Sequence, residues 1–395
     1  MRATIALWRA FSDCRAHRTI RKNQEGPADR AVSTITIEPI DFNTLEQEAQ
    51  QAGLTLPIEQ TGVWATFQAD IPGRTPAGSY RISSDGQPVA FISMIDMATH
   101  GYHYLRSMHG PAWITKPEQA EERQVVDALA SYFRKHDGQA AFLRIDTWYD
   151  DGVVPVLSTV PYDQTVVIDV TGGDEAILSR MKRRGRRDVR KSLRECPAEV
   201  ADETPQAIAD FSEYYDVMVE TGRRDGFTPA PITDYSDMIQ ALGADHCRVF
   251  AARIDNRVVA WSIVTVNVAH AVRYYAGMRN DVMRMHVTDK LLYSECCILG
   301  GQGITEYDLM GIGSDFAPSL KGLNEFKTKF TEEITPVAAG HDVPIKKGFY
   351  TLLTLVKSVR DKLRAAKKTK KTGETGKTSQ NDKTGKGSTT DKAGN

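Results

Sequence analysis

Hydrophobic and polar residues alternate in short runs through the first part of the chain. An apolar alternation of period two, bounded by turn residues, predicts strands within residues 33–40, 78–95, 140–149 and 164–172. Residues 118–136 instead have the apolar spacing of a helix, which we expect to lie between Pro117 and Asp137. The first part of the chain therefore mixes strands with a long helix.

The second part of the chain restarts this pattern. Residues 204–224 have helical spacing, and one predicted face carries Ile208, Phe211, Tyr215, Met218 and Val219. Residues 247–267 alternate on both sides of Asp255-Asn256, which predicts a β-hairpin. The elements expected after the hairpin are a strand at 270–280, a helix at 287–303, a buried strand at 305–313 and an amphipathic helix at 349–364.

Helix, hairpin, strand, helix and strand is the order found in acyltransferases of the GNAT type, and the first part reads as a weaker copy of this unit. We therefore expect an α/β fold with two GNAT-like domains in tandem. A chain of 395 residues is long enough for two hydrophobic cores. The expected parts are a loosely ordered extension at 1–34, a first domain at 35–183 plus 339–366, a second domain at 184–338 and a disordered basic tail at 367–395.

The bulk composition places the chain among globular proteins. It is 41% hydrophobic and 8% aromatic, and no run is as long and apolar as a membrane-spanning helix. Arg9 interrupts the apolar stretch near the start, so we do not expect a signal peptide. Five cysteines without zinc or disulfide-scaffold spacing indicate no metal site and a reducing compartment, the cytoplasm.

Positive charge is concentrated in one short stretch. The chain has 50 Lys+Arg against 51 Asp+Glu, yet nine of the fifteen residues from Arg180 to Arg194 are basic. On one helix these side chains cover an arc of roughly 200°. The narrow opposite side carries Leu178, Met181, Gly185, Val189 and Ser192. Such a face suits the phosphates of nucleic acid, a nucleotide diphosphate or anionic lipid, with Arg183, Arg187 and Arg190 as contacts. The alternative is a solvated face without a ligand.

The end of the chain is basic as well. Residues 367–395 contain eight Lys against three acidic residues, a net charge of 8 − 3 = +5, and no hydrophobic residue larger than Ala. This composition predicts disorder, and a solubilising role is the simplest interpretation. The other interpretations are attraction to the anionic inner face of the plasma membrane and non-specific attraction to tRNA.

The segment expected to bind an acyl donor departs from the acetyl-CoA pattern. GNAT enzymes hold the pyrophosphate of acetyl-CoA on a glycine-rich turn that opens a helix. Here residues 277–290 read GMRNDVMRMHVTDK and lack the R-x-x-G-x-G/A pattern. We therefore expect a donor other than coenzyme A, and no cofactor.

The order and spacing of several motifs resemble the FemABX family. The motifs of the second part are FSEYYDVMVETGRRDGF (211–227), VFAARIDNRVVAWSIV (249–264), RYYAGM (273–278), GITEYDLMGIG (303–313) and GLNEFKTKF (322–330). Those of the first part are IEQTGVWATFQ (58–68), YHYLRSMHGPAW (102–113) and FLRIDTW (142–148). MKRRGRRDVRKS (181–192) matches the basic stretch that this family carries between its domains, and the likeness covers about residues 36–364.

This resemblance implies a specific reaction. FemABX proteins are non-ribosomal peptidyltransferases with two GNAT-like domains. They move an amino acid from aminoacyl-tRNA to the side-chain amine of residue three of a peptidoglycan precursor, either UDP-MurNAc-pentapeptide or its lipid-linked form. Both substrates carry phosphate, which accounts for the local positive charge. Because the connection from Phe227 to Cys247 is short, the chain resembles the FemX-like members without a coiled-coil arm.

The resemblance also implies the catalytic residues. Lys327 in NEFKTKF would lie near the reacting ester, with Phe326 holding it in place. Aminolysis of an ester passes through a tetrahedral oxyanion, which a fixed ammonium stabilises. The competing interpretation is an exposed lysine at the end of a strand, with Lys329 on the same side of that strand.

Four further residues match positions of the family that bind the acceptor. Asp146 would face the peptide and bind or deprotonate its ammonium, and Tyr275 would line the acceptor channel. Arg224 would bind phosphates, with Arg223 competing for this role, and Trp64 is the fourth candidate for substrate binding. Each also has a structural interpretation, namely a turn cap for Asp146, a helix-end arginine for Arg224 and core packing for the two aromatic residues. Armless relatives carry a lysine shortly after the tryptophan, where this chain has Thr66. That difference points to a lipid-linked acceptor.

Three other functions stay open at this point. One is transfer from aminoacyl-tRNA to a lipid head group or a protein N-terminus. A second is a GNAT-like enzyme that uses acyl-CoA, which the missing pyrophosphate loop disfavours. The third is a non-catalytic module that binds tRNA or a membrane.

Overall fold

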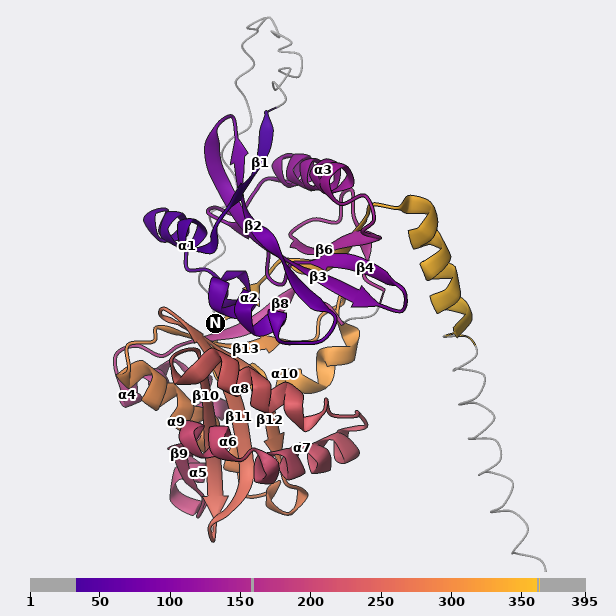
Figure 1. Cartoon of the computed structure of the whole chain (residues 1–395). Coiled ribbons are helices and arrows are strands. Elements are labelled where there is room, and N and C mark those ends of the chain that lie inside the picture. The colour runs from indigo at the N-terminus through magenta and orange to yellow at the C-terminus, as the bar shows by residue number, and fades with distance from the viewer. Residues whose placement is uncertain (1–32, 158–159, 361, 363–395) are drawn as a thin grey trace, which may run out of the picture. The chain divides into compact units, whose positions relative to one another are not determined.

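The computed structural model describes residues 33–157, 160–360 and 362, which contain two β-sheets with helices packed against them (Figure 1). The expected tail at 367–395 lies outside the described residues, as does the extension apart from Ser33 and Thr34.

The first sheet is mostly antiparallel. Its strands follow the order β1 (Ile35–Ile40), β2 (Arg74–Ser84), β3 (Gln87–Thr99), β4 (Tyr102–Arg106), β6 (Phe142–Thr147), β15 (Ala339–Pro344) and β7 (Val154–Pro155), and β5 (Ala112–Trp113) pairs with β3. The pair β4 and β6 is parallel, and α3 (Gln119–His136) lies between these two strands in the chain. Val125, Leu129 and Phe133 of α3 are buried in the core of this sheet. We call the part built on this sheet the first domain.

The second sheet repeats this arrangement. Its strands follow the order β14 (Thr335–Pro336), β8 (Gln164–Asp169), β13 (Glu306–Gly311), β12 (His270–Met278), β11 (Arg257–Asn267), β10 (Cys247–Ile254) and β9 (Glu199–Asp202). The pair β12 and β13 is parallel, and α9 (Val287–Gly301) connects its two strands. Each sheet thus has a parallel pair bridged by a helix, as expected for two related units. The part built on this sheet is the second domain.

The other helices divide between the two domains. Those of the first are α1 (Phe42–Gln51) and α2 (Gly62–Ala69), after the short 3-10 turn η1 (Ile58–Gln60). Those of the second are α4 (Asp174–Arg180), α5 (Arg183–Glu195), α6 (Thr204–Ala209), α7 (Ser212–Asp225), α8 (Ile232–His246) and α10 (Lys321–Lys327), with the 3-10 turns η2 (Asn280–Val282) and η3 (Pro318–Leu320). Residues 347–360 form a last helix. Within the described residues, no helix is long enough for a coiled-coil arm, and α8 occupies the connection after Phe227.

The chain passes from the first sheet to the second earlier than the sequence pattern suggested. β8 was expected in the first domain, which was placed at 35–183, but it pairs with β13 and β14 of the second sheet. Its Ile168 is fully buried in the core of the second domain. The sequence pattern therefore predicted that β8 is a strand, but it did not identify the sheet to which this strand belongs. The chain returns to the first sheet with β15, which pairs with β6.

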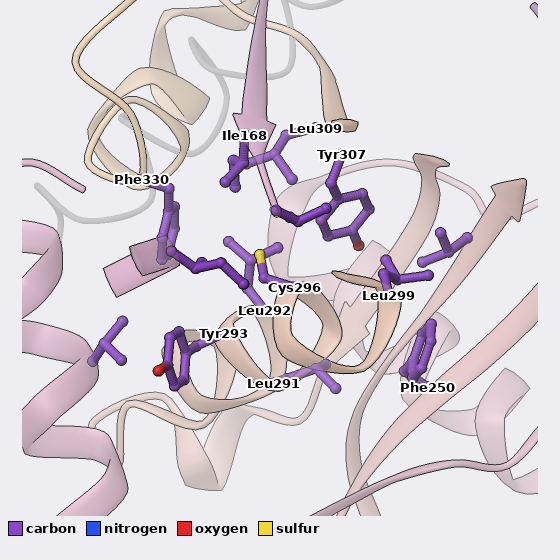
Figure 2. Packing of buried hydrophobic residues seen from close by; sticks show 14 of the residues in the cluster. Ile168, Phe250, Leu291, Leu292, Tyr293, Cys296, Leu299, Tyr307, Leu309 and Phe330 are labelled. Carbon is purple, nitrogen blue, oxygen red and sulfur yellow. The ribbon is translucent and has the colours of Figure 1, made fainter. Parts of the chain in front are cut away.

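The core of the second domain gathers side chains from distant parts of the chain. Figure 2 labels several of these residues, namely Ile168, Phe250, Leu291, Leu292, Tyr293, Cys296, Leu299, Tyr307, Leu309 and Phe330. Phe330 is fully buried there, three residues after Lys327. The core therefore anchors the segment that follows α10.

Two predicted helices are broken in the structure. The basic stretch was treated as one helix, but Met181 and Lys182 have extended backbone between α4 and α5, and the Lys182 N–H donates to the carbonyl oxygen of Lys329 at 3.1 Å. Residues 204–224 are interrupted at Asp210, whose carboxylate accepts from the Ser212 N–H at 2.8 Å. A short polar side chain that caps the next helix competes with helix continuation.

The break at Asp210 also shifts the buried face of the following helix. The buried residues of α7 are Tyr214, Val217, Met218, Thr221 and Gly222, whereas Tyr215 and Val219 of the predicted face are only partly buried. The narrow side predicted for the basic stretch is buried in spite of the break. Its buried residues include Met181, Gly185, Val189 and Ser192.

Candidate active site

Three cavities lie where residues of the two sheets meet. The aromatic cavity, of about 430 Å³, is lined by Trp64, Phe67, Arg106, Tyr274 and Tyr275 among others. The acid cavity, of about 470 Å³, is lined by Glu59, His109, Asp146, Tyr162 and Asp308 among others. The bridging cavity, of about 210 Å³, shares Arg106 and Met310 with the first and His109, Asp146 and Tyr162 with the second. Both domains therefore contribute walls to one chain of cavities.

A half-buried histidine–carboxylate pair lies on the wall shared by the acid and bridging cavities. The backbone N–H of His109 donates to Oδ2 of Asp146 at 3.1 Å, and Nδ1 of the same histidine lies 3.4 Å from that oxygen. The Asp146 N–H in turn donates to the carbonyl oxygen of Gly110 at 2.8 Å. These contacts fix the loop after β4 to the end of β6.

Burial and charge shift the proton affinity of both groups upward. Burial raises the pKa of Asp146, against the opposing effects of His109 and Arg106. For His109, burial alone lowers the pKa, but the negative charges of Glu59, Asp146 and Asp308 together outweigh it and raise the pKa. A pair that binds protons more readily than usual is suited to general acid–base chemistry near neutral pH.

Glu59 is the most isolated acid in this region. Its side chain is 4% exposed, it lines both the aromatic and the acid cavity, and it has no hydrogen-bond or ion-pair partner among the described residues. A buried carboxylate without a partner is costly unless a ligand satisfies it. Within the described residues no group of side chains has the arrangement of a metal site. The carboxylates that line the acid cavity suit an ammonium group.

A backbone irregularity at the end of β13 shapes the other side of these cavities. Met310 has a φ of +62°, and the pairing of β13 with β8 shifts register between Asp308 and Gly311. The Asp308 carboxylate accepts from the Met310 N–H at 2.6 Å and from the Thr165 hydroxyl, which holds this conformation. Left-handed backbone at a non-glycine residue is uncommon and is often found at functional sites.

Lys327 is attached to this irregular strand end. It is the last residue of α10, and its Nζ donates to the carbonyl oxygens of Met310 at 3.2 Å and of Gly311 at 2.9 Å. Burial lowers the pKa of Lys327 to about 8. Lys327 itself lines none of the three cavities, but Met310 lines both the aromatic and the bridging cavity. The ammonium therefore lies directly behind a residue of the cavity wall.

The structure separates Lys327 from the competing Lys329. Lys329 is 8% exposed and pairs with the carboxylates of Asp188, at 3.4 Å, and Asp289. The expectation that both lysines lie on one side of a strand was wrong, because Lys327 ends a helix and the chain turns after it. Phe326 packs edge-on against Phe330, with ring centroids 5.2 Å apart. Its ring anchors the end of α10 to the core.

The other predicted residues differ in position. Trp64 and Tyr275 line the aromatic cavity, where Trp64 also packs against Tyr274 with centroids 5.8 Å apart. Arg224 lines none of the cavities, because its guanidinium bonds to Asp225 at 2.8 Å and to the carbonyl oxygen of Met278 at 2.7 Å. Arg224 thus has the contacts of a helix-end arginine in this structure.

The basic residues of α5 lie outside the cavities. Arg183, Arg187 and Arg190 are exposed, and of these Arg187 pairs with Asp188 at 3.1 Å. In the described part of the chain Arg183 and Arg190 have no ion-pair partner. These two side chains are available to an external anion.

The basic helix is nevertheless tied to the segment that carries Lys327. Arg184 pairs with Glu325 of α10 at 2.6 Å, and Asp188 pairs with Lys329. A Cβ added at Gly185 would lie 2.2 Å from the carbonyl oxygen of Lys329, so only glycine permits this close approach. An anion bound on α5 would therefore act next to the Lys327 segment.

Sequence reasoning missed several residues of this site. Glu59, Arg106, His109, Tyr162 and Asp308 line the cavities, and none was proposed as a site residue. All except Tyr162 fall within motifs that carry the FemABX resemblance. Charged residues inside those motifs were the available indication, but only the fold brings them to a common cavity.

Comparison with known proteins agrees with this fold. A model described as "Acetyltransferase (GNAT) domain" matches residues 179–327, which run from the end of α4 to Lys327. The solved structure of FemX matches with a TM-score of 0.63 and 14% identity, covering 80% of this chain and 99% of that one. The chain has the FemX fold. Its two sheets are therefore GNAT-like domains in tandem, and the predicted fold and FemX resemblance are confirmed.

Two further solved structures have lower similarity to this chain. L-PGS from Bacillus licheniformis matches with a TM-score of 0.47 and 15% identity over 81% of this chain and 97% of that one. A tandem GNAT protein from the clavulanic acid biosynthesis pathway matches with a TM-score of 0.44 and 10% identity over 78% of this chain and 97% of that one. No curated protein matches the sequence.

Proposed function

We propose that this FemX-like chain is an aminoacyltransferase that moves an amino acid from aminoacyl-tRNA to the side-chain amine of residue three of a peptidoglycan precursor. The observation that carries the proposal is the position of the acid cavity, with Glu59, His109 and Asp146, beside the strand end that holds Lys327. The acid cavity suits an amine acceptor, and Lys327 suits an ester donor.

The acid cavity provides the chemistry that an amine needs. The carboxylates of the cavity wall attract an ammonium, and the Asp146–His109 pair can accept the proton that this ammonium must lose before it attacks. The neutral amine then adds to the carbonyl carbon of the aminoacyl ester. The nitrogen loses a second proton, the bond to the tRNA ribose oxygen breaks, and that oxygen takes up a proton. The products are an amide, free tRNA and one released proton.

Lys327 provides a donor for the intermediate. Two of its three N–H groups bond to backbone carbonyls, and the third has no partner among the described residues. This third N–H can stabilise the oxyanion that forms at the ester carbonyl. Arg183 and Arg190 lie on α5, which is attached to the segment that carries Lys327. If tRNA phosphates bound to these two arginines, the aminoacylated end of the tRNA would be directed toward Lys327.

The first turn of α9 supports a donor other than coenzyme A, which many GNAT enzymes use. A pyrophosphate would need free N–H groups and positive charge there. Instead Asp289, which is 4% exposed, occupies this turn and pairs with Lys329 and, at 3.0 Å, with His286. Its negative charge opposes a pyrophosphate, which favours a donor of another kind.

The test is transfer of labelled amino acids from a total pool of charged tRNA. Purified protein is incubated separately with UDP-MurNAc-pentapeptide, the lipid-linked precursor, phospholipid vesicles and acceptor proteins, and acetyl-CoA replaces charged tRNA in a parallel reaction. We expect label on a precursor, and on the lipid-linked form in particular, since this chain has Thr66 where armless relatives carry a lysine. Label on phospholipid or protein would replace the acceptor in this proposal. Binding of tRNA without transfer to any acceptor would indicate a non-catalytic module.

A further inference from the structure

The helix at 347–360 is attached to the first domain only by its first two turns. Tyr350 is buried there, and its hydroxyl donates to Oδ2 of Asp342 at 2.9 Å. Phe349 and Leu353 pack against the same small cluster. After Leu353 no residue of the helix is buried, and in Figure 1 the yellow helix extends away from the sheet.

One face of this helix is apolar and uncovered. Leu352, Leu355, Val356 and Val359 are 53%, 59%, 59% and 58% exposed, respectively. Their spacing of three and four residues places all four on one side. The other large exposed hydrophobic residues of the described chain, such as Val268 and Leu193, lie singly. A contiguous exposed stripe of this kind indicates an interaction surface.

The charge of this segment is opposite to that of the rest of the chain. Residues 346–395 contain 14 Lys+Arg and 4 Asp+Glu, a net charge of 14 − 4 = +10, so residues 1–345 carry −1 − 10 = −11. Arg360 and Lys362 are exposed on the two sides of the apolar stripe. An anionic surface would attract this segment and repel the remainder, which fixes how the protein approaches it.

We propose that the helix at 347–360 binds the surface of an anionic lipid bilayer, with its four aliphatic side chains among the acyl chains and its basic residues at the lipid phosphates. Aliphatic side chains favour a bilayer over RNA, because they neither stack on bases nor contact phosphates. A second copy of the chain is disfavoured, because two such helices would bring equal positive charges together. No helix among the described residues is long and apolar enough to cross a membrane, so this contact is peripheral.

The proposal is independent of the transferase reaction and needs its own test. Full-length protein is mixed with vesicles of phosphatidylcholine containing phosphatidylglycerol, and with phosphatidylcholine vesicles alone, and the bound fraction is measured by flotation. The matched variants are Leu355→Ser with Val359→Ser in the helix, and Val268→Ser, which is 77% exposed elsewhere. Because all three side chains are exposed, the variants should melt like the wild type.

We expect binding to the anionic vesicles only, a loss of about tenfold or more in the double variant, and no change in Val268→Ser. The variants keep residues 367–395, so this loss would identify the helix rather than the basic tail as the contact. Equal binding by the double variant and the wild type would overturn the proposal. So would a dimer, measured by sedimentation, that the double variant loses while vesicle binding persists.

Discussion

The ammonium of Lys327 donates a hydrogen bond to the carbonyl oxygen of Gly311 at 2.9 Å, at the point where β13 leaves regular pairing. The Tyr162 ring lies against Gly311, since a Cβ added there would be 2.4 Å from that ring. One glycine therefore places the lysine beside a wall shared by both domains. Because Lys329 lies in an ion-pair network instead, the two lysines should respond differently to substitution.

Replacing Lys327 with Met should lower the rate of aminoacyl transfer by about 10²–10³-fold, the usual effect of removing one oxyanion donor. The melting temperature should change little, because a partly desolvated ammonium contributes little to folding. Lys329→Met is the matched control, and it should destabilise the protein by about 3–5 kcal/mol, because two buried carboxylates lose the cation that they share. Single-turnover transfer and thermal unfolding measure both effects. Equal losses of activity at equal stability would contradict the assignment.

The pH dependence of transfer should report the lowered pKa of Lys327. Since this pKa is about 8, the ammonium predominates at pH 7 and is lost as the pH rises above 8. The rate should therefore fall on the alkaline side with a midpoint near pH 8. Lys327→Arg keeps its charge at every accessible pH, so its residual activity should lack this alkaline fall. An identical alkaline midpoint in both proteins would show that another group is responsible.

Asp146 should control the titration of His109. The negative charges near His109 raise its pKa above 6.5, so the imidazole stays protonated to a higher pH than usual. Asp146→Asn removes one of these charges and should shift the midpoint of the His109 imidazole, followed by NMR, to lower pH. His109→Gln identifies the resonance. An unchanged midpoint in Asp146→Asn would mean that the two groups are not coupled.

Loss of the acid–base pair should also appear in the rate. We expect Asp146→Asn and His109→Gln each to reduce transfer by about 10²-fold or more, the usual range for general acid–base groups. Thermal unfolding shows whether each variant is folded. Wild-type transfer rates in both variants would remove the pair from the mechanism.

The contact between α5 and the segment that carries Lys327 can be tested by substituting two glycine residues. Gly185→Ala should destabilise the protein by about 1–3 kcal/mol and reduce transfer, since its Cβ would overlap the Lys329 carbonyl. Gly322 of α10 has no atom within 4 Å of the same added Cβ, so Gly322→Ala should raise stability by roughly 0.5–1 kcal/mol. Denaturant unfolding measures both. The contact would be refuted if Gly185→Ala were as stable as Gly322→Ala.

Charge reversal should test the polyanion surface. Arg183→Glu with Arg190→Glu should weaken tRNA binding, and added salt should reduce wild-type binding in the same way. The control is Arg134→Glu with Lys135→Glu, which makes an equal charge change at exposed residues of α3 in the first domain. Filter binding at low salt compares them. Similar losses in both pairs would indicate only a general charge effect.

Local hydrophobic patterns predicted strands and helices well where the pattern itself indicates the buried face. The period-two runs became β2, β3 and β10–β13, and the helix expected at 118–136 is α3. The pairing of β8 could not be predicted in this way, because alternation shows that a strand has a buried face but does not identify its partner. The break at Lys182 depends on a backbone hydrogen bond to a distant residue. The break at Asp210 depends on its carboxylate, which accepts from a nearby backbone N–H. A helical wheel represents neither bond.

The candidate site was predictable only in part. Lys327, Asp146, Trp64 and Tyr275 came from the family resemblance, and the structure places the last three on cavity walls. Glu59 gave no indication of its role, since its importance comes from being buried without a partner. Arg224 matched its motif, yet Asp225 and Met278 occupy its guanidinium. Such competition between neighbours is visible only in three dimensions.

The most direct test of the account is mass spectrometry of lipid-linked precursor after incubation with charged tRNA and the wild-type protein. The account predicts a mass increase of one amino-acid residue or more, located by fragmentation on the side-chain amine of residue three, and no increase with Lys327→Met. Precursor that stays unmodified, in both its lipid-linked and its UDP-linked form, while the tRNA loses its amino acid to water would contradict it.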